Sequence, residues 1–258
     1  MMIKVNENHR PILKHMFKSM DSAIVLSAIQ GHMGEIWVNR SDKPTAAQIK
    51  VGIFVYYAGE PVGDGVNELL GNLTEDSLVI VENDLWKRRI EEWHAGNFEK
   101  FHRFRFKKDP AHLNISHLQN ILAKLPDGYE IRRIDEEIIK DPALHELSPD
   151  FTGHFDSASD FLSRGIGFVI LKGGTITCGA SSYSIYDQGI EVEIATYPDY
   201  RRKGLASVAA AALMLGCLEN GLYPSWDAAN ANSARLAEKL GYIMDEPYDT
   251  YYIPYKNG

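Results

Sequence analysis

The stretch that decides the fold runs from Gly189 to Gly221 and reads GIEVEIATYPDYRRKGLASVAAAALMLGCLENG. In its first part, apolar residues alternate with other residues. This period of two predicts a half-buried strand on which Glu191 and Glu193 share one face. After a turn at Pro198, apolar residues recur at the spacing of an α-helix, and Gly221 marks the predicted end of that helix.

The turn between this strand and this helix is basic and contains glycine: residues 201–206 read RRKGLA. Backbone N–H groups at the start of a helix lack intrahelical partners, and the helix dipole adds partial positive charge there. Gly204 and Ala206 leave room for a ligand to approach the backbone, so the turn is a candidate phosphate or pyrophosphate site. The alternative is a surface turn whose basic side chains are simply solvated.

The segment YPDYRRKGLA at residues 197–206 resembles the coenzyme-A pyrophosphate loop of the GNAT (GCN5-related N-acetyltransferase) superfamily. That loop reads Arg/Gln-x-x-Gly-x-Gly/Ala, which Arg201, Gly204 and Ala206 match. Further along, NANSARLAEKLGY at residues 230–242 resembles the superfamily's Asn-x-x-Ser/Ala helix, which ends in Lys-Leu-Gly-Phe/Tyr. The two segments occur in the family's order.

The resemblance implies an α/β chain whose residues 128–258 form a GNAT acetyltransferase domain, with a mixed, splayed central sheet flanked by helices. The pattern of this half, β-α-α-β-β-β-α-β-α-β-β, agrees with the GNAT order. A breaker cluster at residues 125–128 separates it from residues 1–127, an α/β domain of unclear role for which a degenerate GNAT-like half is one interpretation. In that first domain we expect a helix over residues 10–30 and one β segment over residues 46–57.

The whole chain, with PSWDAAN at residues 224–230, also resembles a narrower group. This is a bacterial GNAT subfamily of about this length that carries an extra N-terminal region and includes the zwittermicin A resistance protein. Acetyl-CoA as the cosubstrate, without a metal, is what either resemblance implies.

In the family, loop amides bind the coenzyme pyrophosphate, and the end of the preceding strand pairs with the pantetheine arm. The resemblance therefore implies coenzyme-binding roles for Ile194, Ala195, Thr196, Arg201, Arg202, Lys203, Gly204, Leu205, Ala206, Asn230 and Ser233. For Asn230 and Ser233 the alternative is an ordinary role at the start of the next helix, and one residue could serve both purposes.

The chemistry that the resemblance implies is direct attack of an amine on the acetyl carbonyl. Because the amine must be neutral, a general base is expected. Glu193 is our preferred candidate and Glu191 the second; the alternative is that both are solvated or that one orients a substrate cation. Many family members carry a tyrosine as general acid where this chain has Ala237. The acid is therefore unassigned, and solvent could protonate the thiolate.

Composition excludes several other classes. The formal net charge of −8 argues against broad nucleic-acid binding. Residues 1–20 lack a signal-peptide core, and no apolar run is long enough to cross a bilayer. With only Cys178 and Cys217, a disulfide framework is not expected, which favours a reducing, cytoplasmic location. Neither a Walker lysine motif nor the three-glycine dinucleotide fingerprint is present, and no histidines show metal-ligand spacing.

The resemblance therefore implies an acetyl-CoA-dependent N-acyltransferase acting on a small-molecule or protein amine in a ternary complex. The alternative is a coenzyme-A-binding sensor or interaction module without turnover. We expect no nucleic-acid or membrane partner, and a homodimer is one of the assemblies left open. The acceptor is not specified by the sequence, although Asp150, Asp156 and Asp160 could attract a cationic amine.

Overall fold

The computed structural model describes residues 1–73 and 75–255, whose backbone forms two compact units. The first unit comprises Met1–Arg103 together with the described residues from Pro247 onward, and the second comprises Phe104–Glu246. The chain thus leaves the first unit once and returns to it near its C-terminus.

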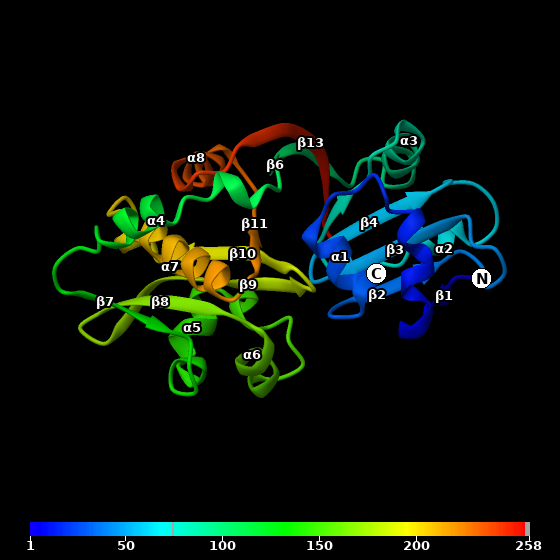
Figure 1. Ribbon diagram of the computed structural model, residues 1–258. Helices are drawn as coiled ribbons and strands as arrows, with labels where there is room; N and C mark the ends of the chain where they lie inside the picture. The colour runs from blue at the N-terminus through cyan, green and yellow to red at the C-terminus, as the bar shows by residue number, and fades with distance from the viewer. Residues whose placement is uncertain (74, 256–258) are drawn as a thin grey trace. The chain divides into compact units, whose positions relative to one another are not determined.

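The first unit is an α/β layer structure built on one sheet (Figure 1). Its elements in chain order are β1 (Ile3–Lys4), the 3-10 helix η1 (Glu7–His15), α1 (Ala23–Gln30), β2 (Glu35–Val38), β3 (Ala46–Val51), β4 (Phe54–Gly59), α2 (Val66–Leu70), β5 (Ser77–Ile80) and α3 (Asp84–Trp93). The strand β13 (Met244–Ile253) follows β5 in the order β1-β2-β3-β4-β5-β13, and β6 (Glu99–Phe106) and β12 (Asp227–Ala228) extend the sheet beyond it. From β1 to β13 in this order, neighbouring strands are antiparallel except β4 and β5, which are parallel. Trp86, Tyr57 and Tyr251 are among the fully buried side chains of its core.

The second unit carries the motif-bearing stretch. Its elements are the end of β6 (Glu99–Phe106), η2 (Pro110–His112), α4 (Ile115–Leu122), β7 (Tyr129–Arg133), η3 (Ile138–Lys140), α5 (Pro142–Leu147), η4 (Pro149–Phe151), α6 (Ala158–Arg164), β8 (Gly167–Lys172), β9 (Thr175–Tyr186), β10 (Gly189–Thr196), η5 (Pro198–Tyr200), α7 (Leu205–Glu219), β11 (Tyr223–Ser225), β12 (Asp227–Ala228) and α8 (Ala231–Leu240). Its main sheet has the order β11-β10-β9-β8-β7, antiparallel except for the parallel pair of β10 and β11.

Helices cover both faces of this sheet. A Cβ built on Gly216 of α7 would lie 3.1 Å from the Phe168 ring, while a Cβ built on Gly179 would lie 2.7 Å from the Phe151 ring of η4. Phe168 pairs with Ala180, the residue after Gly179. Because successive strand residues face opposite sides, α7 and η4 lie on opposite faces.

The central helix α7 is more deeply buried than its spacing predicts. Apolar positions along it indicated a helix with one buried side, yet residues on nearly every side are buried because α4 covers the side turned away from the sheet. Its run of alanines keeps the helix slender enough to pack between those layers.

The two units repeat one order of elements. In each, four antiparallel strands are followed by a helix and a fifth strand that lies parallel to the fourth. The fold is therefore α/β with mixed, splayed sheets, as expected, and the first unit has the strand arrangement of a GNAT-like half.

Several local expectations need correction. The helix expected over residues 10–30 is η1 and α1 with an irregular segment between them. The β segment expected over residues 46–57 is the hairpin β3–β4, which turns at Gly52, where φ is 52°. The two compact units divide the chain after residues 103 and 246, because α4 packs on α7 and β13 pairs with β5, while the domain boundary between residues 127 and 128 stays a prediction.

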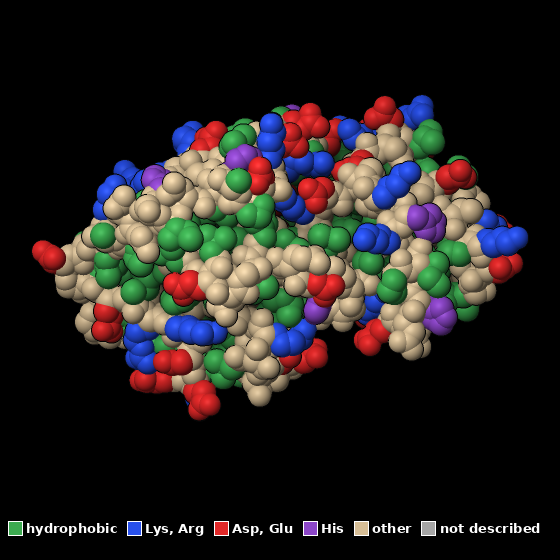
Figure 2. Space-filling view, in the orientation of Figure 1, with side chains coloured by type: hydrophobic (Ala, Val, Ile, Leu, Met, Phe, Trp, Pro, Cys, Tyr) green, Lys and Arg blue, Asp and Glu red, His purple; other side chains and the backbone are tan. Residues whose placement is uncertain are grey.

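No helix among the described residues combines the length and apolar character needed to span a membrane. On the face shown in Figure 2, basic and acidic side chains are interspersed rather than gathered by sign.

Candidate functional site

The site begins where β10 and β11 separate. The two strands pair in parallel over only three positions, the last of which joins Glu191 and Ser225. After Trp226 the chain continues as β12, which pairs with β6 instead of β10. Residues 223–228 thus form two short strands, β11 and β12, and not one. Residues Val192–Thr196 of β10 lie beyond its last pair with β11, which leaves an open strand edge.

The N-terminus of α8 is fixed close to the end of this edge. Asn230 is its N-cap: Oδ1 accepts the backbone N–H groups of Asn232 and Ser233, each at 3.0 Å. Trp226, at the point where β11 ends, donates its indole N–H to Ser233 Oγ at 3.2 Å. The residue that ends strand pairing therefore also positions the first turn of the helix.

The basic turn has the backbone of an anion cradle. Arg202 adopts φ of 61° and Gly204 adopts φ of 82°, two left-handed residues in a short turn. Within the described chain, none of the backbone amides of residues 202–206 donates to a protein acceptor. Consecutive unpaired amides at a helix N-terminus attract negative charge. A Cβ built on Gly204 meets no atom within 4 Å, so the space beside these amides is open.

Two cationic side chains of the turn fold back on the turn itself. Arg201 Nε donates to the Thr196 carbonyl oxygen at 3.1 Å. Lys203 Nζ donates to the Asp199 carbonyl oxygen at 2.9 Å and lies 4.8 Å from the centre of the Tyr200 ring. Because these contacts are to carbonyl oxygens and a ring, both positive charges stay available to an anion nearby.

The strand edge, the turn and α8 enclose a groove of about 770 Å³. It is lined by Glu146, Leu147, Ile194, Ala195, Thr196, Tyr197, Pro198, Arg201, Ala206, Asn230, Asn232, Ser233 and Leu236. The expected coenzyme-binding residues of β10 and α8 thus line one groove together with Arg201 and Ala206. Arg202, Lys203 and Gly204 lie exposed on the turn outside the lining, and the Leu205 side chain is buried in the core.

The two candidate bases have different surroundings. Glu193 is half-buried, and its Oε1 accepts a hydrogen bond from Ser148 Oγ at 3.1 Å. Glu191 is only 7% exposed and pairs with Ser184 and Ser225 on the two neighbouring strands. The interpretation of Glu191 as a solvated residue on a polar face is therefore wrong, because strands flank it on both sides.

Sequence reasoning missed one wall of the groove. Glu146 and Leu147 end α5, which carries no motif, and only the fold brings this helix beside β10. Tyr197 stood inside the quoted stretch without an expected role. Its hydroxyl donates to the Ala143 carbonyl oxygen at 3.0 Å, and burial raises its pKa, helped by the carboxylates of Glu146 and Asp141.

The position of the missing tyrosine, a nearby tyrosine and both cysteines lie in the core. Ala237 is fully buried, and the Tyr242 hydroxyl donates to the Pro224 carbonyl oxygen at 2.5 Å. Burial raises the pKa of the Cys178 thiol to about 11 and that of Cys217 to about 12, so neither is suited to act as a nucleophile. Among residues 1–73 and 75–255, no three His, Cys, Asp or Glu side chains are grouped to hold a metal ion.

Comparison with known proteins places this arrangement in a family. The profile of the GNAT acetyltransferase family matches residues 14–251. This chain belongs to the GNAT acetyltransferase family.

Individual relatives agree with this assignment. A crystal structure of a GCN5-related N-acetyltransferase-like protein from Streptococcus suis 89/1591 is 34% identical, with a TM-score of 0.87 over 96% of this chain and 100% of that chain. The uncharacterized N-acetyltransferase YdfB of Bacillus subtilis strain 168 is 36% identical over 131 residues, which make up 50% of this chain and 50% of that protein. The match thus spans half the length of this curated relative. A tandem GNAT protein from the clavulanic acid biosynthesis pathway shares the fold, with a TM-score of 0.57 and 13% identity over 98% of this chain and 96% of that chain.

The first GNAT-like unit has a helix start that corresponds to the start of α8, but a side chain fills the space beside it. Asn83 caps α3 as Asn230 caps α8, accepting the Trp86 N–H at 2.8 Å. Trp86 stands three residues after its cap, as Ser233 does in the second unit. It is fully buried, stacks on Tyr57 with ring centres 5.0 Å apart, and donates its indole N–H to the Gly59 carbonyl oxygen at 2.9 Å. A large ring thus fills the space beside the end of β4.

The turn after β4 also differs from the basic turn of the second unit. It carries Glu60 and Asp64 and no lysine or arginine, and it leads into a helix of only five residues. A Cβ built on Gly65 would lie 2.1 Å from the Asn39 carbonyl oxygen, whereas the same construction on Gly204 meets open space. The features of an anion cradle are therefore those of the second unit.

Proposed function

We propose that this GNAT protein is an acetyl-CoA-dependent N-acetyltransferase that acetylates a primary amine of a small molecule or a protein. The observation that carries the proposal is the run of unpaired amides at residues 202–206, which opens beside the groove along residues 194–196. The amides at one end of the groove can bind a pyrophosphate. The strand edge can form hydrogen bonds with the amide groups of an extended ligand.

The residues present fit the coenzyme on two counts. Backbone N–H groups of the turn supply donors for phosphate oxygens, and Arg201 and Lys203 add positive charge. The unpaired edge of β10 offers peptide groups to the amides of a pantetheine arm, in the manner of an added strand. Bound acetyl-CoA supplies an acetyl group activated as a thioester.

Glu193 is the proposed general base. An aliphatic ammonium must lose a proton before it can attack, and a half-buried carboxylate beside the strand edge can take that proton directly or through one water. A base of this kind contributes about 10²–10⁴-fold to the rate. The acyl group would pass directly from coenzyme to amine in a ternary complex.

Protonation of the departing thiolate is assigned to solvent. The position at which many GNAT proteins carry a tyrosine is the buried Ala237, and the Tyr242 hydroxyl is committed to the Pro224 carbonyl oxygen. We therefore expect turnover to depend on the base and not on a phenol.

The test is release of free coenzyme A from acetyl-CoA in the presence of a panel of primary amines, with Glu193→Gln compared to the unaltered protein. We expect the variant to lose at least 100-fold in kcat and to keep its affinity for acetyl-CoA within twofold. Acetyl-CoA binding without acetylation of any amine would instead support a non-catalytic coenzyme-A sensor, which the buried Ala237 favours. If Glu193→Gln turned over at the rate of the unaltered protein, Glu193 would not be the general base.

A further inference from the structure

We propose that Ser148 is a positioning residue for the Glu193 carboxylate, holding it ionised and aimed beside the open edge of β10. The proposal rests on the proposed function, in which Glu193 is the base. Its direct evidence is the hydrogen bond from Ser148 Oγ to Glu193 Oε1 at 3.1 Å, made by a serine that is only 7% exposed.

Ser148 is held by backbone contacts that do not use its side chain. It lies between α5 and η4, where its N–H donates to the Leu144 carbonyl oxygen at 3.2 Å and its own carbonyl oxygen accepts the Phe151 N–H at 3.3 Å. The hydroxyl is therefore free to serve Glu193, and its removal leaves the local backbone bonds in place.

The same pair of strands fixes both partners. Phe151, three residues after Ser148, is fully buried over Gly179 of β9, where even a Cβ would come within 2.7 Å of its ring. Ser181 Oγ donates to the Phe151 carbonyl oxygen at 2.7 Å, and Ser181 is the residue paired with Glu193 across β9 and β10. The donor and acceptor of the Ser148–Glu193 bond are thus tied to neighbouring points of one sheet.

A bulge separates the two glutamates. The register of β9 and β10 shifts between Glu191 and Val192, so that Tyr183 is the extra residue on β9. Bulges re-aim side chains and are frequent next to active sites. Here Glu191 lies buried between strands, whereas Glu193 reaches the α5–η4 segment.

The hydroxyl has a defined electrostatic effect. A donated hydrogen bond favours the ionised carboxylate and lowers its pKa, while like charges nearby raise it. The other titratable side chains on β10, β9, α5 and residues 148–154 are Glu191, Cys178, Tyr183, Tyr186, His145, Glu146, Asp150 and His154, of which Asp150 and His154 pair at 3.0 Å. Three of these groups, Glu191, Glu146 and Asp150, are carboxylates that would disfavour a charge on Glu193, and the Ser148 hydroxyl acts in the opposite direction.

The test is a pH titration of the glutamate side-chain carboxyl carbons by NMR in the full chain. Glu193→Gln assigns the Glu193 signal, and Ser148→Ala is compared with Ser148→Thr, which keeps a hydroxyl. Ser157→Ala is the control, because it removes a serine hydroxyl that accepts the Asp160 N–H instead of donating to Glu193. We expect Ser148→Ala to raise the Glu193 midpoint by about 1 pH unit, Ser148→Thr to restore it, and Ser157→Ala to leave it unchanged.

A kinetic measurement separates positioning from mere contact. In Ser148→Ala the acidic limb of the kcat/KM profile is expected to move to higher pH with the NMR midpoint, while KM for acetyl-CoA stays within twofold. An unchanged midpoint overturns the proposal, and so does a shifted midpoint with an unshifted rate profile. If the unaltered protein turns over no amine while it binds acetyl-CoA, the proposed function fails instead, and the titration still shows whether Ser148 controls the carboxylate.

Discussion

Asn230 has two roles, one in the helix and one in the groove. Its Oδ1 caps α8, and its side chain also lines the groove. Within the described chain its Nδ2 group donates to no protein acceptor, so capping leaves that amide available to a ligand. Substitution can therefore separate the two roles.

We expect Asn230→Asp to keep the cap and lose the amide donor. Aspartate caps helices as well as asparagine does, so stability should stay within about 0.5 kcal/mol, whereas affinity for acetyl-CoA should fall about tenfold because a charge of the wrong sign enters the groove. Asn230→Ala should lower the free energy of unfolding by about 1 kcal/mol. Urea unfolding and calorimetric titration of both variants measure this. Coenzyme binding by Asn230→Asp equal to that of the unaltered protein would leave Asn230 with a capping role alone.

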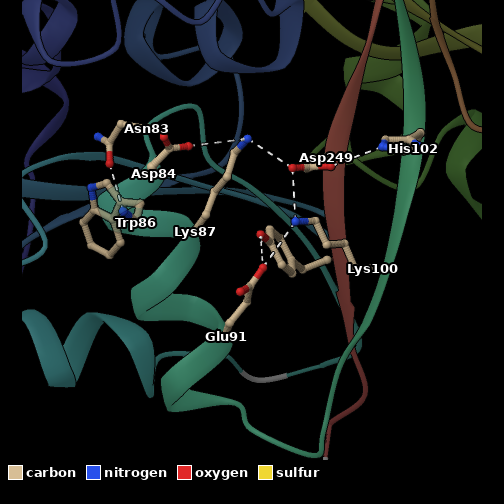
Figure 3. Close-up of polar contacts among 9 residues, drawn as sticks. Asn83, Asp84, Trp86, Lys87, Glu91, Lys100, His102 and Asp249 are labelled. Atoms are coloured by element: carbon tan, nitrogen blue, oxygen red, sulfur yellow. Dashed lines mark hydrogen bonds and ion pairs between the residues drawn. The ribbon is translucent and has the colours of Figure 1, made fainter.

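At the scale of elements, β13 is the strand that returns to the first unit, where its side chains form ion pairs with neighbouring elements. Asp249 lies on β13, and its Oδ2 is 3.1 Å from Lys87 Nζ of α3 and 3.2 Å from Lys100 Nζ of β6 (Figure 3). Its Oδ1 is 3.3 Å from Nε2 of His102, which also lies on β6. Tyr251 adds a hydrogen bond to Glu91 Oε1 at 2.8 Å. One carboxylate thus links β13 to α3 and β6, two elements that lie far earlier in the sequence.

Asp249→Asn is expected to lower the free energy of unfolding by about 1 kcal/mol at pH 7. Burial raises the pKa of this carboxyl, but hydrogen bonds from Lys87 and Lys100 outweigh burial and lower it. A folded-state pKa below the unfolded value means that this stability is present at neutral pH and is lost as pH falls below about 4.

Thermal unfolding between pH 3 and pH 7 measures the effect. Asp245→Asn, an exposed carboxylate on the same strand, is the matched control and should change little. Equal melting temperatures for the two variants at pH 7 would contradict the role given to Asp249.

The elements that sequence alone predicts are those with strong local signals. The alternating strand β10, the basic turn, α7 and α8 lie at the positions predicted from the sequence of residues 189–242. The β3–β4 hairpin was missed because apolar and β-branched residues continue almost through its turn at Gly52. The split of β11 from β12 and the α5 wall of the groove depend on contacts with β6 and β10, which no local pattern encodes.

At the scale of the whole molecule, two GNAT-like units share an order of elements but not a site. The first unit has Trp86 packed beside the end of β4 and an acidic turn, whereas the second has open space at Gly204 and a basic turn. The comparisons support a tandem arrangement as a matter of fold. We therefore propose coenzyme binding for the second unit alone.

We therefore expect one acetyl-CoA per chain, because the first unit offers neither an open slot nor a cationic turn. Native mass spectrometry of the full chain with excess acetyl-CoA measures the number bound. Trp86→Phe is a control variant, since it removes the indole donor to Gly59 while keeping a large ring in the space. This variant should also bind one acetyl-CoA per chain. Two molecules bound per chain would contradict the closed state of the first unit.

The central claim is that the amides of residues 202–206 bind the coenzyme pyrophosphate, and the most direct measurement is calorimetric titration of acetyl-CoA into Gly204→Asp and Gly204→Asn. Both side chains tolerate the left-handed φ of 82° and are of equal size, so they differ in charge alone. Gly221→Asp, at another open left-handed glycine just beyond α7, is the control. We expect the unaltered protein and Gly221→Asp to bind in the micromolar range, with Gly204→Asp at least tenfold weaker than Gly204→Asn. Equal affinity of the two Gly204 variants would contradict the claim.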